Sequence, residues 1–377
     1  MNINRLLLIQ DNSLLQNFYR DRLERAGFAV QSVASVEEGL RRMGSALPDL
    51  VVLDPLLPDG DAAQSISAVR SFSGAAEVPI IVLPTQQRAI AEAIEQDSHT
   101  KLIEQTGNTA VGLICAAADI VDRDKLDPGE LKNIMEGDEP DHIWRSAALN
   151  AAPAAVTQMH QTLHAVVRDK TAPEPLRTLL QNVHSFADQM TLLGPSAISQ
   201  VASALEVLVY GLVQCPERLD ELVLRTLGQA VDFIGAMLQS SNAMRAGDTR
   251  SAHVMVVEDE PAARELIITA MSLVGLIADG LDNPTTSVAV LSTQPCDLIF
   301  LDINLPDMNG FELCTQLRTM SLHEKTPIVF ITGMNSFQNR VQSNLSGGND
   351  FVGKPFNIAE LGLKALIWVL RGQFGMN

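Results

Sequence analysis

Short apolar runs alternate with amphipathic segments in the C-terminal third of the chain. The runs HVMVV, CDLIFLD and PIVFIT (253–257, 296–302 and 327–332) are almost wholly apolar, which is typical of strands buried on both faces. Between them, residues 261–275 and 310–320 carry apolar side chains at three- and four-residue spacing, which predicts helices. This alternation predicts a doubly wound parallel sheet with helices on both sides.

The same pattern occurs a second time near the N-terminus. The phrase LDPLLPDGD at 53–61 resembles FLDINLPDMNG at 300–310, and Asp302 lies 248 positions after Asp54. We therefore expect two copies of one α/β domain, over residues 1–122 and 251–377. The same offset also pairs Asp259 with Asp11, Gly275 with Gly27, Asp297 with Asp49, Pro306 with Pro58, and Pro327 with Pro79.

The segment between the copies, residues 126–248, has a helical period instead. Its apolar positions predict an all-α domain, a bundle of about four helices, and residues 244–252 are expected to link it to the second copy. The clearest apolar stripe consists of Ile198, Val201, Leu205, Leu208, Val209 and Leu212.

Composition narrows the function classes. The chain has 377 residues, of which 46% are hydrophobic, so each domain can form a core. A formal charge of −18 argues against nucleic acid as a partner, because phosphate binding needs a basic face. No apolar run approaches the ~18 residues of a membrane span, and no signal pattern opens the chain, so we expect a cytoplasmic location. The four cysteines are scattered and indicate neither disulfides nor a zinc site.

Polar side chains follow the predicted strands of the second copy. Glu258 and Asp259 follow the first strand, Asp302 and Thr332 end two others, and Lys354 follows a fourth. Three neighbouring carboxylates would repel one another unless a cation lies among them, and oxygen ligands suit Mg²⁺. The amine and the hydroxyl would complete a pocket for a tetrahedral anion. The alternative is that these acids are ordinary helix caps and solvated turn residues.

The types and spacing of these residues resemble the receiver domain of two-component response regulators. The resemblance implies that Asp302 takes a phosphoryl group from phosphohistidine. It implies that Asp259, Asp302 and the backbone carbonyl of Asn304 hold Mg²⁺, with Glu258 acting through a metal-bound water. Lys354 and Thr332 would bind the phosphoryl oxygens, in keeping with the electrostatic demands of phosphoryl transfer.

Three further positions of the second copy belong to this reading. A small residue at Gly333 would leave the pocket mouth open to a donor protein. Phe351 matches the aromatic residue that rotates inward when the threonine moves, although it also suits an ordinary core. Met334, two residues beyond Thr332, is expected to slow loss of the phosphoryl group, since it is apolar.

The first copy lacks several of these groups. Gln10 replaces the glutamate, Pro84 replaces the threonine, and the lysine position falls at Thr106 or Gln105; Asp11 and Asp54 remain. Lys101 lies several residues too early. We expect a pseudo-receiver that contacts a partner or the rest of the chain. The alternative is weak phosphorylation at Asp54.

The middle segment resembles a histidine phosphotransfer (HPt) module, a four-helix bundle with an exposed histidine. Residues 184–194, HSFADQMTLLG, contain the histidine, leucine and glycine of that pattern at His184, Leu193 and Gly194. Ala187 and Asp188 replace its lysine and glycine, and Asp188 places negative charge beside the histidine. We expect either phosphotransfer at His184 or a degenerate module used for docking or dimerisation. The pair His160 and His164 is expected to be on the surface.

These patterns together predict a response regulator phosphorylated at Asp302, with output through protein contact or dimerisation rather than DNA binding. Its donor would be a histidine kinase or phosphotransfer protein, and its target another protein or a second copy. No catalytic output motif is present, so we do not expect an enzyme. The alternatives are an internal phosphorelay between Asp302 and His184, and a constitutive scaffold.

Overall fold

In the computed structural model the chain forms two compact units. The first unit comprises Met1–Ala155 and Leu180–Pro195, and the second comprises Val156–Leu179 and Ser196–Asn377. Residues of the predicted helical middle therefore belong to both units. The structure describes residues 4–84, 97–103, 109–121, 141–194, 196–240, 252–333 and 346–376.

The first unit contains a parallel five-stranded sheet in the order β2-β1-β3-β6-β7. A separate two-residue pairing, β4 (Leu56–Leu57) with β5 (Gly60–Asp61), follows β3. The predicted parallel α/β fold is confirmed for this copy. The strands are β1 (Arg5–Ile9), β2 (Ala29–Val33), β3 (Leu50–Leu53), β6 (Ile80–Val82) and β7 (Thr100–Leu102).

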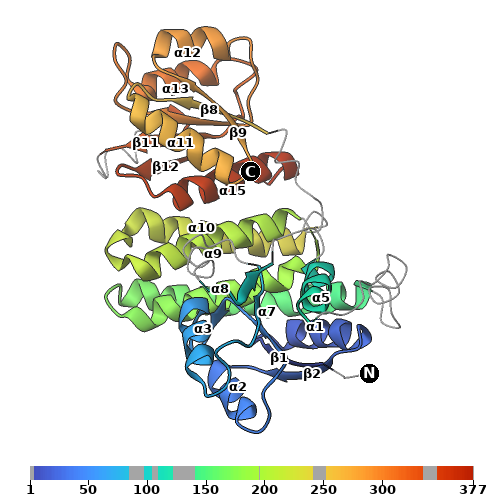
Figure 1. Ribbon diagram of the computed structural model, residues 1–377. Helices are drawn as coiled ribbons and strands as arrows, with labels where there is room; N and C mark the ends of the chain where they lie inside the picture. The colour runs from blue at the N-terminus through green and yellow to red at the C-terminus, as the bar shows by residue number, and fades with distance from the viewer. Residues whose placement is uncertain are drawn as a thin grey trace. The chain divides into compact units, whose positions relative to one another are not determined.

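Helices cover both faces of this sheet (Figure 1). Leu8 and Val52 pack with residues of α1 (Ser13–Arg25) and α5 (Thr109–Ile120) in one core cluster. On the other face, the backbone of α2 (Val36–Met43) passes so close that a Cβ at Gly39 would lie 3.0 Å from Ile9. The helix α3 (Ala62–Ser71) packs beside α2. Alternate strand residues therefore face opposite layers, which explains why the strands are apolar throughout.

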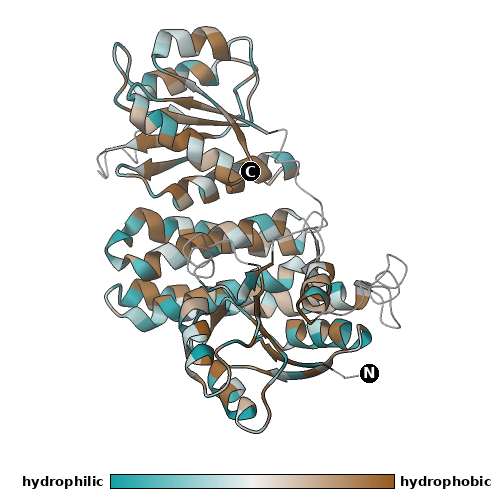
Figure 2. Ribbon diagram, viewed as in Figure 1, coloured by the Kyte–Doolittle hydropathy of each residue, from teal (hydrophilic) through white to brown (hydrophobic). Residues whose placement is uncertain are grey.

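The second unit contains the other sheet, in the order β12-β11-β10-β8-β9. Numbered along the chain within each sheet, the strands of both sheets lie in the order 2-1-3-4-5. Figure 2 shows its strands as almost uniformly hydrophobic ribbons, whereas the surrounding helices are mixed. The strands are β8 (His253–Val257), β9 (Ile277–Leu281), β10 (Leu298–Asp302), β11 (Ile328–Thr332) and β12 (Asp350–Gly353). The helices are α11 (Pro261–Leu273), α12 (Pro284–Leu291), α13 (Gly310–Arg318) and α15 (Ile358–Phe374).

The repeat extends to individual hydrogen bonds. The Asp49 carboxylate accepts a bond of 2.7 Å from the backbone N–H that opens β1, and Asp297 accepts one of 2.8 Å from the N–H that opens β8. The carbonyls of Pro79 and Pro327 accept equivalent bonds from β3 and β10. These paired residues therefore form equivalent hydrogen bonds in both copies.

Four helices make up the described part of the middle segment, and the predicted apolar stripe on α9 is buried. In the second unit, α9 and α10 pack against α15 of the receiver-like sheet. Among the residues that the structure describes, α9 alone is long and apolar enough to cross a membrane, but its stripe packs in the protein core, as in a core helix. These helices are α7 (Asp141–Arg168), α8 (Pro173–Thr191), α9 (Ala197–Gln214) and α10 (Glu221–Gln239), with a short 3₁₀ turn η1 (Pro216–Arg218).

Candidate functional site

The predicted site residues of the second copy lie at one edge of its sheet. Glu258 directly follows β8, Asp302 and Thr332 are the last residues of β10 and β11, and Lys354 directly follows β12. Because these strands are parallel, their carboxyl ends meet at the same edge. The four residues therefore share one edge of the sheet, where the sequence places them.

Lys354 joins two of the carboxylates. Its Nζ lies 2.8 Å from Asp302 Oδ2 and 2.8 Å from Glu258 Oε2. Both carboxylates are buried, whereas the lysine side chain is 25% exposed. Burial and the nearby Asp302 raise the pKa of Glu258 to about 7, against the lowering effect of Lys354. The lysine is therefore the local counter-charge to an acidic, partly desolvated cluster.

The three acids also form a suitable donor set for a divalent ion. Ligand oxygens of Glu258, Asp259 and Asp302 all lie within 4.8 Å of one another, and Asp259 is exposed. An all-oxygen set with a solvent-facing side fits Mg²⁺, which retains several waters. The backbone N–H of Asn304 donates to Asp302 Oδ1 over 3.1 Å, so the loop that carries its carbonyl is held at the site.

Two glycines shape this edge. A Cβ at Gly310 would lie 2.1 Å from the Asp302 carbonyl oxygen, so only glycine permits α13 to begin against the end of β10. At Gly333 a Cβ would meet no atom of the described residues within 4 Å. Thr332, just before it, is buried.

Phe351 lies under a helix that the sequence did not connect with it. The guanidinium carbon of Arg225, in α10, lies 5.0 Å from the centre of the Phe351 ring. Leu222 of the same helix belongs to the same apolar cluster as Phe351. The sequence predicts α10 only as part of the helical middle segment, so nothing in its pattern indicates this contact.

A buried polar cluster lies next to Phe351 and joins α10 to the receiver. Lys364 Nζ of α15 lies 2.7 Å from Asp350 Oδ2, with both side chains buried. The Thr226 hydroxyl of α10 donates to Glu360 Oε1 over 2.6 Å. Burial raises the pKa of Glu360, and Lys364 and Thr226 partly oppose that rise.

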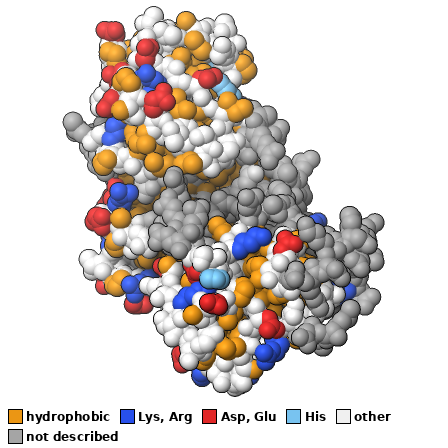
Figure 3. Space-filling view, in the orientation of Figure 1, with side chains coloured by type: hydrophobic (Ala, Val, Ile, Leu, Met, Phe, Trp, Pro, Cys, Tyr) orange, Lys and Arg blue, Asp and Glu red, His pale blue; other side chains and the backbone are white. Residues whose placement is uncertain are grey.

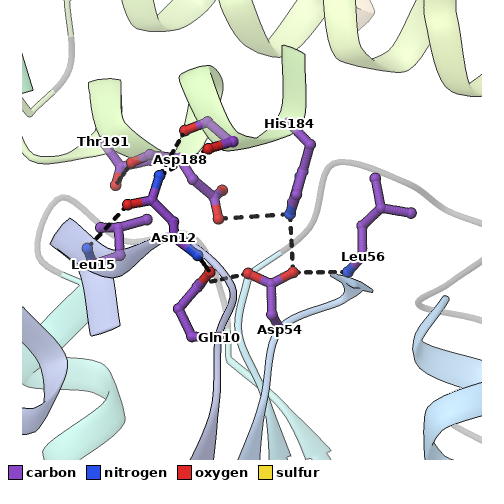
Figure 4. A network of polar contacts seen from close by, with 9 residues as sticks. Gln10, Asn12, Leu15, Asp54, Leu56, His184, Asp188 and Thr191 are labelled. Atoms are coloured by element: carbon purple, nitrogen blue, oxygen red, sulfur yellow. Dashed lines mark hydrogen bonds and ion pairs between the residues drawn. The ribbon is translucent and has the colours of Figure 1, made fainter. Parts of the chain in front are cut away.

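In the first copy, the equivalent aspartate is occupied by other groups (Figure 4). Asp54 Oδ1 accepts from the Leu56 N–H over 2.8 Å and lies 2.9 Å from His184 Nε2. Asp54 Oδ2 accepts from the Gln10 amide nitrogen. The Gln10 oxygen accepts from the Asn12 N–H over 2.9 Å, which fixes the direction of the amide. Asp54 is completely buried.

His184 is therefore not the exposed histidine that the HPt resemblance implies. It lies in α8 with 3% of its surface exposed, and its Nε2 is also 3.6 Å from Asp188 Oδ2, one turn along. The prediction that Asp188 lies beside it is confirmed. His164 is exposed and His160 lies 3.4 Å from Asp232, and both histidines belong to the second unit.

Asp11 remains as an unusual acid beside this contact. Burial, and then the charge of Asp54, raise its pKa to about 6, and its Oδ1 is buried without a hydrogen-bond partner. The equivalent Asp259 of the second copy is exposed.

Strand register shows which residue of β7 corresponds to Phe351. Leu102 pairs with Val82 as Phe351 pairs with Phe330, so Leu102 is the counterpart of Phe351. Gln105, Thr106 and Met334 lie outside the described residues. Lys101 is exposed on β7, and Pro84 lies just beyond β6.

The response regulator receiver domain matches this chain twice, over residues 6–106 and 254–365. The two matches cover more than half of the sequence. The chain therefore belongs to the response regulator receiver family, and its two α/β domains are receivers.

Each individual relative matches a stretch about as long as one receiver domain. The chain is 32% identical over 126 residues to the probable transcriptional regulatory protein TcrX of Mycobacterium tuberculosis, and 33% identical over 119 residues to the transcriptional regulatory protein CusR of Escherichia coli. These matches cover 33% and 32% of this chain, and 53% and 52% of the relatives, so the chain spans about half of their length.

Solved receiver structures give a similar partial match. The Francisella response regulator 1452 receiver domain is 25% identical, with a TM-score of 0.31, over 32% of this chain and 98% of its own. The receiver domain of the Pseudomonas aeruginosa sensor histidine kinase PA1611, with magnesium in its active-site cleft, is 25% identical, with a TM-score of 0.29, over 31% and 97%. At these TM-scores the structural likeness adds nothing to the sequence match.

Proposed function

We propose that the C-terminal receiver is an Mg²⁺-dependent phosphoryl acceptor and that Asp302 takes the group from a histidine kinase or a phosphotransfer protein. The observation that carries this proposal is the position of Lys354, whose amine lies 2.8 Å from both Asp302 and Glu258. A cation there, next to an acceptor carboxylate, suits an incoming anion. The remaining pocket residues agree with this chemistry.

In the proposed transfer, an Asp302 carboxylate oxygen attacks the phosphorus of phosphohistidine. The P–O bond forms while the P–N bond breaks, and the imidazole keeps the electron pair and regains a proton. Lys354 and the Thr332 hydroxyl would bind the phosphoryl oxygens. Glu258, Asp259, Asp302 and the Asn304 carbonyl are the residues that would hold Mg²⁺, which neutralises charge on the transferred group.

The test is phosphorylation of the full chain by acetyl phosphate with Mg²⁺, followed by intact mass measurement. We expect a phosphoryl adduct that Asp302→Asn abolishes. The matched variant Asp54→Asn, in the other receiver, should leave the adduct unchanged. An adduct that survives Asp302→Asn would show that the acceptor lies elsewhere.

The N-terminal receiver is proposed to be a pseudo-receiver. Its Asp54 makes hydrogen bonds to Gln10, Leu56 and His184, and Pro84 provides no hydroxyl where the other copy has Thr332. A neutral amide and an occupied acceptor cannot stabilise an added phosphoryl group as the lysine site does.

The output of phosphorylation is proposed to be a change in protein contacts rather than DNA binding or catalysis. Within the second unit, α10 lies on Phe351 through Arg225 and on α15 through Thr226. A shift of Phe351 therefore acts on α10 directly. On the face in Figure 3, basic and acidic side chains of the described residues are interspersed without a continuous basic patch. The net charge of −18 likewise favours a protein partner over nucleic acid.

A further inference from the structure

We infer that the C-terminal half of α8 is a docking surface for a receiver domain, and that the N-terminal receiver of the same chain occupies it, with Asp54 and His184 blocking each other's reactive atom. The contact lies within the first unit. It would give the pseudo-receiver a role of its own, separate from phosphorylation of Asp302.

The first support is that Asp54 Oδ1 and His184 Nε2 occupy each other. Asp54 Oδ1 accepts from the Leu56 N–H and lies 2.9 Å from His184 Nε2, while Oδ2 accepts from Gln10. Whichever of the two atoms carries the shared hydrogen, the lone pair of Nε2 cannot attack phosphorus, and both acceptor sites of Oδ1 are engaged. Phosphorylation at Nε2 or at Oδ1 would therefore require the contact to open.

The second support is that the two receivers pair their aspartates with side-chain nitrogens of different origin. In the C-terminal receiver, Lys354 of the same domain lies 2.8 Å from Asp302. In the N-terminal receiver, His184 of α8 lies 2.9 Å from Asp54, in addition to the bonds from Gln10 and Leu56. A buried carboxylate needs such a partner. The N-terminal receiver thus depends on α8 for a side-chain nitrogen beside its aspartate, whereas the C-terminal receiver supplies one from its own Lys354.

The third support is that further contacts surround the Asp54–His184 pair. The Asn12 side chain caps α1 and also donates to Ser185 Oγ over 2.9 Å. An apolar flank lies beside it, where the Phe18 ring meets Trp144 of α7 edge to face and Leu192 packs on the receiver core. Polar anchors and apolar packing together distinguish a built interface from a chance hydrogen bond.

A bridging metal is the competing explanation for the same cluster. Ligand atoms of Asp54, His184 and Asp188 lie within 4.8 Å of one another. The direct distance of 2.9 Å between Asp54 and His184 already satisfies both groups without an ion.

The test measures the reaction of His184 with diethyl pyrocarbonate in the full chain, by peptide mass mapping, with exposed His164 as the internal reference. We expect His184 to react far more slowly than His164 in the unmodified sequence. Asp54→Ala should speed the reaction at His184 about ten- to hundredfold, the change in opening expected from loss of one charge-assisted hydrogen bond. Asp302→Ala, the matched change in the other receiver, should have no effect on His184.

Three results would overturn the inference. One is equal reactivity of His184 and His164 in the unmodified chain, and another is an unchanged His184 rate in Asp54→Ala. The third is acceleration by a chelator alone, because it would identify a metal bridge instead of direct contact.

A second measurement tests the contact independently, in case the Asp54→Ala variant misfolds. His184→Ala changes only α8, and amide exchange in the unphosphorylated chain should then rise at residues 10–15 and 54–57. The equivalent segments 258–263 and 302–305 should not change. Unchanged exchange at 54–57 would contradict the docking role.

Discussion

Single residues separate the two receivers. Glu258 and Lys354 form an ion pair at the C-terminal site, whereas Gln10 at the N-terminal site forms an amide hydrogen bond to its aspartate. The same strand ends therefore present an electrostatically poised carboxylate in one domain and a capped one in the other. The difference resides in side chains, since the strand order and the hydrogen bonds that open the strands agree.

At this scale we predict the effect of Lys354→Met on binding of beryllium fluoride, a phosphoryl mimic. Loss of one charged hydrogen-bond donor, worth about 1.5–3 kcal/mol, should weaken Mg²⁺-dependent binding about ten- to hundredfold. Titration followed by ¹⁹F NMR would measure it. Lys101→Met is the control, because Lys101 is exposed on β7, and it should bind like the unmodified chain. Equal affinity in Lys354→Met would remove the lysine from the site.

At the scale of elements, α15 is held by buried polar contacts as well as by apolar packing. Asp350 begins β12, and its carboxylate is paired with Lys364 and also accepts from the Trp368 indole. These contacts fix α15 against the strand that carries Phe351. Their loss should therefore affect both stability and the position of the helix.

We predict that Lys364→Met destabilises the C-terminal receiver by about 3–5 kcal/mol, because Asp350 would remain buried without its main counter-charge. Urea unfolding followed by Trp368 fluorescence would measure this, in a Trp144→Phe background that removes the second tryptophan. The double variant Lys364→Met with Asp350→Leu should recover part of the loss. A single variant as stable as the background would mean that the pair contributes nothing.

Glu360 should make the stability of this unit depend on pH. Burial raises its pKa in the folded chain above the ordinary 4.5, so the folded chain holds the proton more tightly than the unfolded chain does. Its contribution is therefore present at low pH and is lost as pH rises above about 4.5. Glu360→Gln keeps an acceptor for Thr226 and cannot ionise. It should reduce the fall in stability between about pH 5 and about pH 8, measured by urea unfolding; an identical fall would exclude Glu360 as the cause.

At the scale of the whole molecule, the prediction concerns transmission from Asp302 to α10. Beryllium fluoride at Asp302 should change amide exchange in residues 221–229, since Arg225 and Leu222 contact Phe351 or its cluster. Arg225→Ala should diminish that change without preventing binding of the mimic. Asp302→Ala should abolish both binding of the mimic and the exchange change in α10. Exchange in α10 that does not respond to a bound mimic would refute this route of output.

Sequence reasoning reached the fold and the C-terminal site because both are encoded locally. Apolar runs define the strands, and residues that follow parallel strands must share an edge, so Asp302 and Lys354 were expected to meet. The contact between Asp54 and His184 joins positions 130 residues apart, and neither periodicity nor spacing carries such a pairing. The only signal was negative: Gln10 and Asp188 each departed from the pattern expected of a working partner.

Asn12 carries one more consequence. In the other receiver the equivalent position is Glu260, which caps α11 without a side-chain hydrogen bond. Were that receiver to approach α8, a carboxylate would replace the amide that donates to Ser185 and would face the negative charge of Asp188. On the proposed function, this repulsion would keep Asp302 from pairing with His184, so the phosphorylated receiver and the pseudo-receiver would not compete for the same helix.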